Sequence, residues 1–327
     1  MPTLLIVIIG LALFFDFLNG FHDASNIVAT MISSRAASPR YALAMTAIAE
    51  FVGPFLFGVA VATTIGSEVV DPTAITTTVI MAALSSAILW NLFTWYFGWP
   101  SSTSHALIGG LVGAVVISSG FETLRLAGIN KVLLALFLSP LLGLVLGFIA
   151  LKIIYFLARG ATPGVNNLFK RAQLGTSLAL ALSHGTNDAQ KTMGIIAMAM
   201  VTTGYAGTFH IPWWVITLSA GAIALGTATG GWRLIETLGG KFYKIRPVHA
   251  FGSQLTSAVI ILGAALLGGP VSTTQVVSSS IMGAGSADRV SKVRWNVARD
   301  IAAAWLLTIP TSALVAAGLH SLIDLVL

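Results

Sequence analysis

The chain has 327 residues and a formal net charge of +6, yet only 9% of its residues are charged and 56% are hydrophobic. A soluble globular domain carries about 25% charged residues, so this composition excludes that class and indicates a polytopic membrane protein. No cysteine is present, which excludes disulfides, thiolate metal sites and cysteine nucleophiles. The basic residues lie in connections between apolar stretches, so their charge reports orientation in a membrane and predicts no nucleic-acid partner.

The apolar stretches predict an all-α polytopic fold, because each is close to the length of about 20 residues that a helix needs to cross a bilayer. They cover residues 3–34, 41–65, 73–97, 101–119, 131–151, 174–203, 211–231, 248–267, 271–287 and 300–324. The first stretch has no basic n-region and no small-residue cleavage motif. We therefore expect it to be a retained helix rather than a signal peptide.

A polar cluster interrupts the first stretch between Asn19 and Asn26, in the order Asn-Gly-Phe-His-Asp-Ala-Ser-Asn. Ionisable groups at this depth are costly and usually mark an ion or substrate path. Gly20 weakens a helix, so we expect 3–34 to be a broken helix whose freed carbonyls help to coordinate a cation. The alternative is a polar core that is satisfied between packed helices.

Both this cluster and a second motif recur in the other half of the chain. Gly20 and Asp23 reappear 165 positions later as Gly185 and Asp188, within His-Gly-Thr-Asn-Asp-Ala-Gln, and 174–203 is accordingly expected to be a second broken helix. The second motif recurs at an offset of 170, where Pro-Ser-Ser-Thr-Ser-His at 100–105 aligns with Pro-Val-Ser-Thr-Thr-Gln at 270–275. At the same offset Gly113 matches Gly283 and Pro140 matches Pro310.

The distribution of basic residues predicts the topology. Four connections carry fourteen of the 17 Lys and Arg residues, and the positive-inside rule places all four in the cytoplasm. This holds only if 73–119 and 248–287 are re-entrant helical hairpins that enter from opposite faces. The prediction is an inverted-topology repeat with both termini outside: 1–158 as the first repeat, 159–173 as a cytoplasmic linker and 174–327 as the second repeat.

The hairpin turns predict an anion site. In each, proline precedes a run of hydroxyls and then an apolar helix, which is typical of a helix N-terminus. Such an end favours an anion, and two of them entering from opposite faces would meet near the membrane midplane. The candidate anion-binding residues are Ser102, Thr103, Ser104, Ser272, Thr273 and Thr274.

The aspartates in the two polar clusters would repel an anion unless cations lie between them. Their neighbourhood offers oxygen ligands that suit Na⁺, Mg²⁺, Ca²⁺ or Mn²⁺. The candidate cation ligands are Asp23, Asn26, Asn187, Asp188 and Gln190, with Asp23 and Asp188 as the candidates for binding a metal. His22, His184, Lys191 and Glu50 are candidates for a proton or charge relay.

Together, the Asn19–Asn26 cluster, the His184–Lys191 cluster and the two Pro-x-Ser-Thr/Ser turns resemble the paired signatures of the inorganic phosphate transporter (PiT) family. The resemblance runs from about residue 12 to Pro310. It implies phosphate uptake by an alternating-access symporter in the plasma membrane, usually a homodimer surrounded by lipid. It also implies coupling to Na⁺ in some members and to H⁺ with metal–phosphate complexes in bacterial ones, with no resident cofactor and no enzymatic activity.

Three other functions compete with this interpretation. One branch of the same family carries sulfate, so a sulfate or other oxyanion symporter is the first alternative. A passive anion channel is the second. An intramembrane hydrolase is the third, although the chain has no Gly-x-Ser-x-Gly and no His-Glu-x-x-His motif to supply a nucleophile or a metal.

The predicted topology can be tested by cysteine labelling, because the natural chain contains no cysteine. In intact cells, Ser67→Cys should react with a membrane-impermeant thiol reagent and Lys241→Cys should not. The opposite pattern would contradict the predicted orientation.

Overall fold

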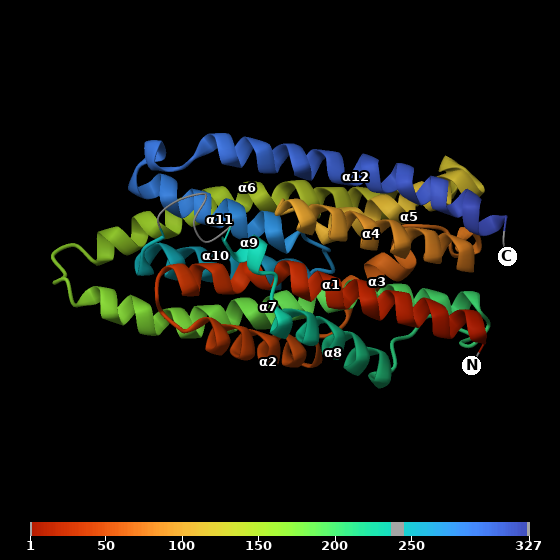
Figure 1. Cartoon of the computed structure of the whole chain (residues 1–327), viewed down its shortest axis with the longest axis horizontal. Coiled ribbons are helices and arrows are strands. Elements are labelled where there is room, and N and C mark those ends of the chain that lie inside the picture. Colours follow the sequence, from red (N-terminus) through yellow and green to blue (C-terminus); the bar gives the residue numbers. More distant parts are fainter. Residues whose placement is uncertain (1, 237–244, 326–327) are drawn as a thin grey trace.

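A computed structural model describes residues 2–236 and 245–325, and every regular element of the described residues is helical (Figure 1). Position 241, used in the labelling experiment, lies outside these residues. The α-helices are α1 (Thr3–Ser33), α2 (Pro39–Phe57), α3 (Ala60–Thr63), α4 (Thr77–Phe97), α5 (Thr103–Ser119), α6 (Leu126–Leu157), α7 (Val165–Thr202), α8 (Trp213–Thr229), α9 (Trp232–Glu236), α10 (Pro247–Leu266), α11 (Thr273–Asp288) and α12 (Trp295–Asp324). A short π-helical segment, Thr64–Glu68, follows α3. The all-α fold class expected from the sequence is confirmed.

Six of the described helices are long and apolar enough to cross a membrane: α1, α2, α4, α6, α10 and α12. Figure 1 shows the long helices running side by side along the long axis of the molecule. The two chain ends lie at the same end of the bundle, and the connection between α6 and α7 lies at the opposite end. That connection is shorter than the predicted linker 159–173, because α7 already begins at Val165, directly after Pro163 and Gly164.

The predicted breaks in the first and seventh helices are wrong, because α1 and α7 continue as α-helices through both polar clusters. Gly20 and Gly185 serve close helix packing instead. A Cβ atom at Gly20 would lie 2.1 Å from the carbonyl oxygen of Ile223 in α8, and one at Gly185 would lie 2.3 Å from that of Glu50 in α2. Only glycine allows the backbones to approach this closely.

Two helical hairpins bring their turns to the clusters. Hairpin 1 consists of α4, the loop 98–102 and α5, and hairpin 2 consists of α10, the loop 267–272 and α11. Gly98 (φ 66°) and Gly268 (φ 73°) reverse the chain after the first helix of each hairpin, in a backbone conformation that favours glycine. The turns touch, since Oγ of Ser104 donates a hydrogen bond of 3.0 Å to the carbonyl oxygen of Val271.

Close contacts between the halves of the chain occur at positions that the predicted repeat relates to one another. Gly113 of hairpin 1 packs on Ala313 of α12, and Gly283, 170 positions later, packs on Leu144 of α6. A Cβ atom at either glycine would lie 2.2 Å from the carbonyl oxygen opposite. Each hairpin therefore packs against a long helix from the other half.

The glycine contacts predict the effect of one added methyl group. Gly20→Ala should force α1 and α8 apart, which we expect to destabilise the protein by about 1–3 kcal/mol and to lower its melting temperature in detergent. Gly10→Ala, in the same helix, is the matched control, because the added Cβ would meet no atom of another helix within 4 Å. Equal melting temperatures for the two variants would refute the close-packing role of Gly20.

Candidate functional site

Asp23 of α1 and Asp188 of α7 form the centre of the site. Their side chains are 1% and 0% exposed. One hydroxyl lies between them: Oγ1 of Thr273 is 3.2 Å from Oδ2 of Asp23 and 3.1 Å from Oδ2 of Asp188. The two carboxylates that the sequence places 165 positions apart are therefore brought together by the tip of hairpin 2.

Other hydroxyls from the hairpin tips also reach Asp23. Thr274 donates to Oδ1 of Asp23 at 2.9 Å, and Thr103 lies 3.5 Å from Oδ2 of the same residue. Thr103 and Thr273 are the first residues of α5 and α11. The first-turn N–H groups of a helix have no acceptor within the helix, so they add a partial positive charge at this point.

The remaining three predicted anion-binding hydroxyls have structural partners. Oγ of Ser102 accepts a hydrogen bond from the backbone N–H of His105, and Oγ of Ser272 accepts one from that of Gln275. These two serines are thus the helix N-caps. Ser104 contacts the other hairpin, as described above. The hydroxyls placed at the carboxylates are therefore those of Thr103, Thr273 and Thr274.

A lysine lies on the other side of Asp188. Nζ of Lys191 is 2.5 Å from Oδ1 of Asp188 and 2.5 Å from Oγ of Ser104, and it donates to the carbonyl oxygen of Val271 at 3.1 Å. Its side chain is 1% exposed. The ammonium group therefore links α7 to both hairpin tips.

Two histidines complete the surroundings of the carboxylates. Nε2 of His184 lies 3.8 Å from Asp23 and 3.4 Å from Asp188, and its Nδ1 lies 2.8 Å from Oε1 of Glu50. Glu50 also accepts a hydrogen bond from Thr227. His22 makes a hydrogen bond of 3.0 Å with Asp23. The predicted relay residues are thus contiguous with the carboxylates.

Asp23, His184 and Asp188 offer one ligand atom each within 4.8 Å of one another, which is a spacing that one metal ion can bridge. His184 is therefore a further candidate ligand, in addition to the relay role predicted from the sequence. Its position was visible in the sequence, because residues four apart on a helix share a face and His184 precedes Asp188 by four.

The predicted amide ligands divide into two groups. Asn26 donates to Thr274 at 3.1 Å and Asn187 donates to the carbonyl oxygen of Gly269 at 3.2 Å. The Oδ1 atoms of both asparagines are buried and accept no hydrogen bond. Gln190 lies away from the site, where it donates to the carbonyl oxygen of Gly58 after α2 and accepts a hydrogen bond from the backbone N–H of Val61 in α3. Helix positions separated by two residues point about 200° apart, so Gln190 cannot share the face of Asp188.

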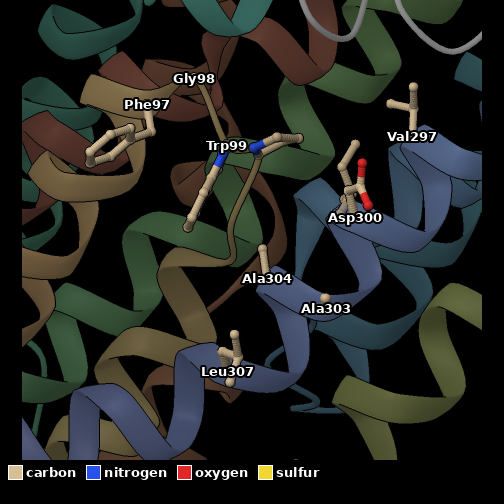
Figure 2. A pocket seen from close by; sticks show the side chains of 10 residues that line it. Phe97, Gly98, Trp99, Val297, Asp300, Ala303, Ala304 and Leu307 are labelled. Carbon is tan, nitrogen blue, oxygen red and sulfur yellow. The ribbon is translucent and has the colours of Figure 1, made fainter.

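A pocket of about 540 Å³ lies beside hairpin 1. Figure 2 shows residues of the loop, including Trp99, on one side and residues of α12, including Asp300, on the other. Trp305 of α12 donates a hydrogen bond of 3.0 Å to the carbonyl oxygen of Pro100. None of the residues around the two carboxylates lines this pocket, so it is separate from the site, although Pro100 in its lining is two residues before the N-cap Ser102.

The bundle of membrane-length helices defines a polytopic membrane protein, and its buried carboxylates lie between two helix N-termini. Comparison with known proteins makes the class specific. The model of the phosphate transporter family matches residues 19–316. The chain therefore belongs to that family, as its sequence motifs suggested.

Similar proteins carry consistent names. The chain is 45% identical over 325 residues to a probable low-affinity inorganic phosphate transporter of Rhizobium meliloti strain 1021, covering 99% of this chain and 97% of the relative. It is also 45% identical over 328 residues to one of Bacillus subtilis strain 168, covering 99% and 98%. A solved sodium-dependent phosphate transporter has a TM-score of 0.89 at 26% identity, covering 99% of this chain and 100% of that one. These relatives are transporters, which sets aside the hydrolase alternative.

Proposed function

We propose that this protein is a symporter that takes up inorganic phosphate together with a cation across the plasma membrane. One observation carries the proposal: the hydroxyls of Thr103, Thr273 and Thr274 are directed at Asp23 and Asp188. A cation bound to the carboxylates would compete for their oxygens. The hydroxyls would then be free to donate to phosphate, so cation binding would promote phosphate binding.

The proposed phosphate site comprises the hydroxyls of the two hairpin tips together with the N–H groups of the first turns of α5 and α11. The proposed cation ligands are Asp23, Asp188 and the free amide oxygens of Asn26 and Asn187. Oxygen ligands suit Na⁺ and divalent cations, and His184 also suits protons or a transition metal. The sodium dependence named for the similar solved structure makes Na⁺ the first cation to test.

Burial of the site supports alternating access over a passive channel. Asp23, Thr103, Asp188 and Thr273 are each at most 2% exposed. A channel needs a continuous open path, whereas a sealed site must be opened by movement of the hairpins or of one half against the other. The pocket between the loop of hairpin 1 and α12 is the proposed approach from the cytoplasmic side. Re-entrance of both hairpins is part of this proposal.

The proposed orientation places both termini outside and the connection between α6 and α7 inside. The shared location of the chain ends supports it, as do the basic residues around that connection. Among the candidate spans, α6 and α12 are the most exposed: only 28% of an apolar 18-residue stretch of each is buried inside the protein. Their exposed faces suit lipid or a second copy of the chain in a homodimer.

Phosphate remains the proposed substrate because the similar proteins are named for it. Sulfate is the alternative, since hydroxyl and N–H donors suit any tetrahedral oxyanion. In both cases the membrane potential opposes anion entry by about 2.3 kcal/mol per charge for each 100 mV, so a cation must accompany the anion.

Asp23→Asn and Asp188→Asn test the proposal most simply. Each change keeps the size of the side chain but removes one negative charge, so cation-driven phosphate uptake into proteoliposomes should be abolished or sharply reduced. Uptake should be measured with Na⁺, H⁺ and Mg²⁺ gradients imposed in turn.

Asp71→Asn is the matched control, because Asp71 is 41% exposed and pairs with Arg125 away from the site. This variant should transport like the wild type. Wild-type rates with unchanged cation dependence in both site variants would refute the proposed coupling.

A further inference from the structure

The two halves of the site differ at one pair of related positions. Asn26 and Lys191 are 165 positions apart, as are Asp23 and Asp188. Their contacts are also related. Asn26 donates to Thr274 of hairpin 2, and Lys191 donates to Ser104 of hairpin 1, 170 positions before Thr274. A neutral amide in the first half therefore corresponds to an ammonium group in the second.

The surroundings of the ammonium group resemble the coordination of a hard cation. Three oxygens of different kinds surround Nζ of Lys191: the carboxylate of Asp188, the hydroxyl of Ser104 and the carbonyl of Val271. Carboxylate, hydroxyl and backbone carbonyl oxygens are the ligands that Na⁺ and similar ions take from proteins. The side chain of Lys191 is almost fully buried, so protein oxygens rather than bulk water surround its ammonium group.

The first half has a similar set of oxygens, with the neutral amide of Asn26 in place of the ammonium group and with the rings of His22 and His184 beside Asp23. Asp23 is contacted by the hydroxyl of Thr274, and Oδ1 of Asn26 is buried without a hydrogen-bond donor. A buried acceptor that lacks a partner is costly. A mobile cation at Asp23 would satisfy it, in the position that corresponds to Nζ of Lys191 in the second half.

We propose that the ammonium group of Lys191 is a tethered cation that fills one of two repeat-related cation positions. The other position, at Asp23 and Asn26, is left to the transported cation. The tethered charge returns with the protein in every cycle and so adds nothing to the charge that is moved. The protein would thus carry one cation fewer per phosphate than a symmetric site would require. This inference rests on the proposed cation-coupled uptake.

Removal of the ammonium group would leave the buried carboxylate of Asp188 with the hydroxyl of Thr273 and the ring of His184 as partners. A buried charge that is not compensated is costly. The second half should therefore recruit a mobile cation when the ammonium group is removed.

Lys191→Asn tests the inference, because it installs the residue of the first half in the second. The reversal potential of phosphate transport in proteoliposomes, measured at fixed Na⁺ and phosphate gradients, reports the net charge that is moved per phosphate. The variant should move one additional positive charge per phosphate compared with the wild type, and its uptake should become more steeply dependent on Na⁺.

Lys131→Asn is the control, because Lys131 pairs with Glu68 at a partly exposed position outside the site. It should leave the charge per phosphate unchanged. A Lys191→Asn protein that transports with the wild-type charge per phosphate overturns the inference. If wild-type uptake shows no coupling to any cation gradient, the proposed symport itself fails, which is a separate result.

A second measurement covers a variant that does not transport. The melting temperature of detergent-purified Lys191→Asn should rise with Na⁺ concentration more steeply than that of the wild type, because an additional bound cation stabilises the folded state. A Lys191→Asn protein that can be purified in folded form only when Na⁺ is present supports the inference. A variant that is equally unstable at all Na⁺ concentrations overturns it and leaves Lys191 with a purely structural role.

Discussion

The position of the two hairpins is explained by the free-energy cost of burying two carboxylates. Asp23 and Asp188 are almost fully buried and share one threonine hydroxyl. An uncompensated buried charge costs several kcal/mol, so each carboxylate requires partners from other segments. Two hairpin tips, two histidines and one lysine supply them. The hairpins must therefore meet at the two central helices, and this meeting point is the proposed site for the substrate anion.

Close packing makes that meeting possible. The carboxylates can share Thr273 only if α1 and α7 are held at a fixed separation, and each is fixed by a glycine against a helix from the other half. Gly20 contacts α8 and Gly185 contacts α2. In both central helices, the glycine that allows close packing lies three residues before the buried aspartate. Movement of the hairpins relative to α1 and α7 would change the shared hydroxyl contacts directly.

Much of this arrangement follows from local sequence. The apolar stretches, the capped turns and the two repeated motifs indicated the helices, the hairpins and the aspartates that come together. The helix breaks were predicted wrongly because glycine both weakens a helix and permits close contact, and only the neighbouring backbone distinguishes the two roles. Gln190 was placed in the site because it is near Asp188 in sequence, although helical geometry turns it away. Ser102 caps α5 and Thr103 faces Asp23, and only the three-dimensional arrangement of the tips distinguishes these two roles.

The central claim is that the carboxylates hold the hydroxyls until a cation binds, and titration calorimetry of the purified protein tests it most directly. Phosphate affinity should be measured with and without Na⁺, and Na⁺ affinity with and without phosphate, with H⁺ and Mg²⁺ as the other cations. The account predicts that a coupling cation and phosphate raise each other's affinity by the same factor, as linkage requires. Phosphate binding that is unaffected by every one of these cations would contradict it.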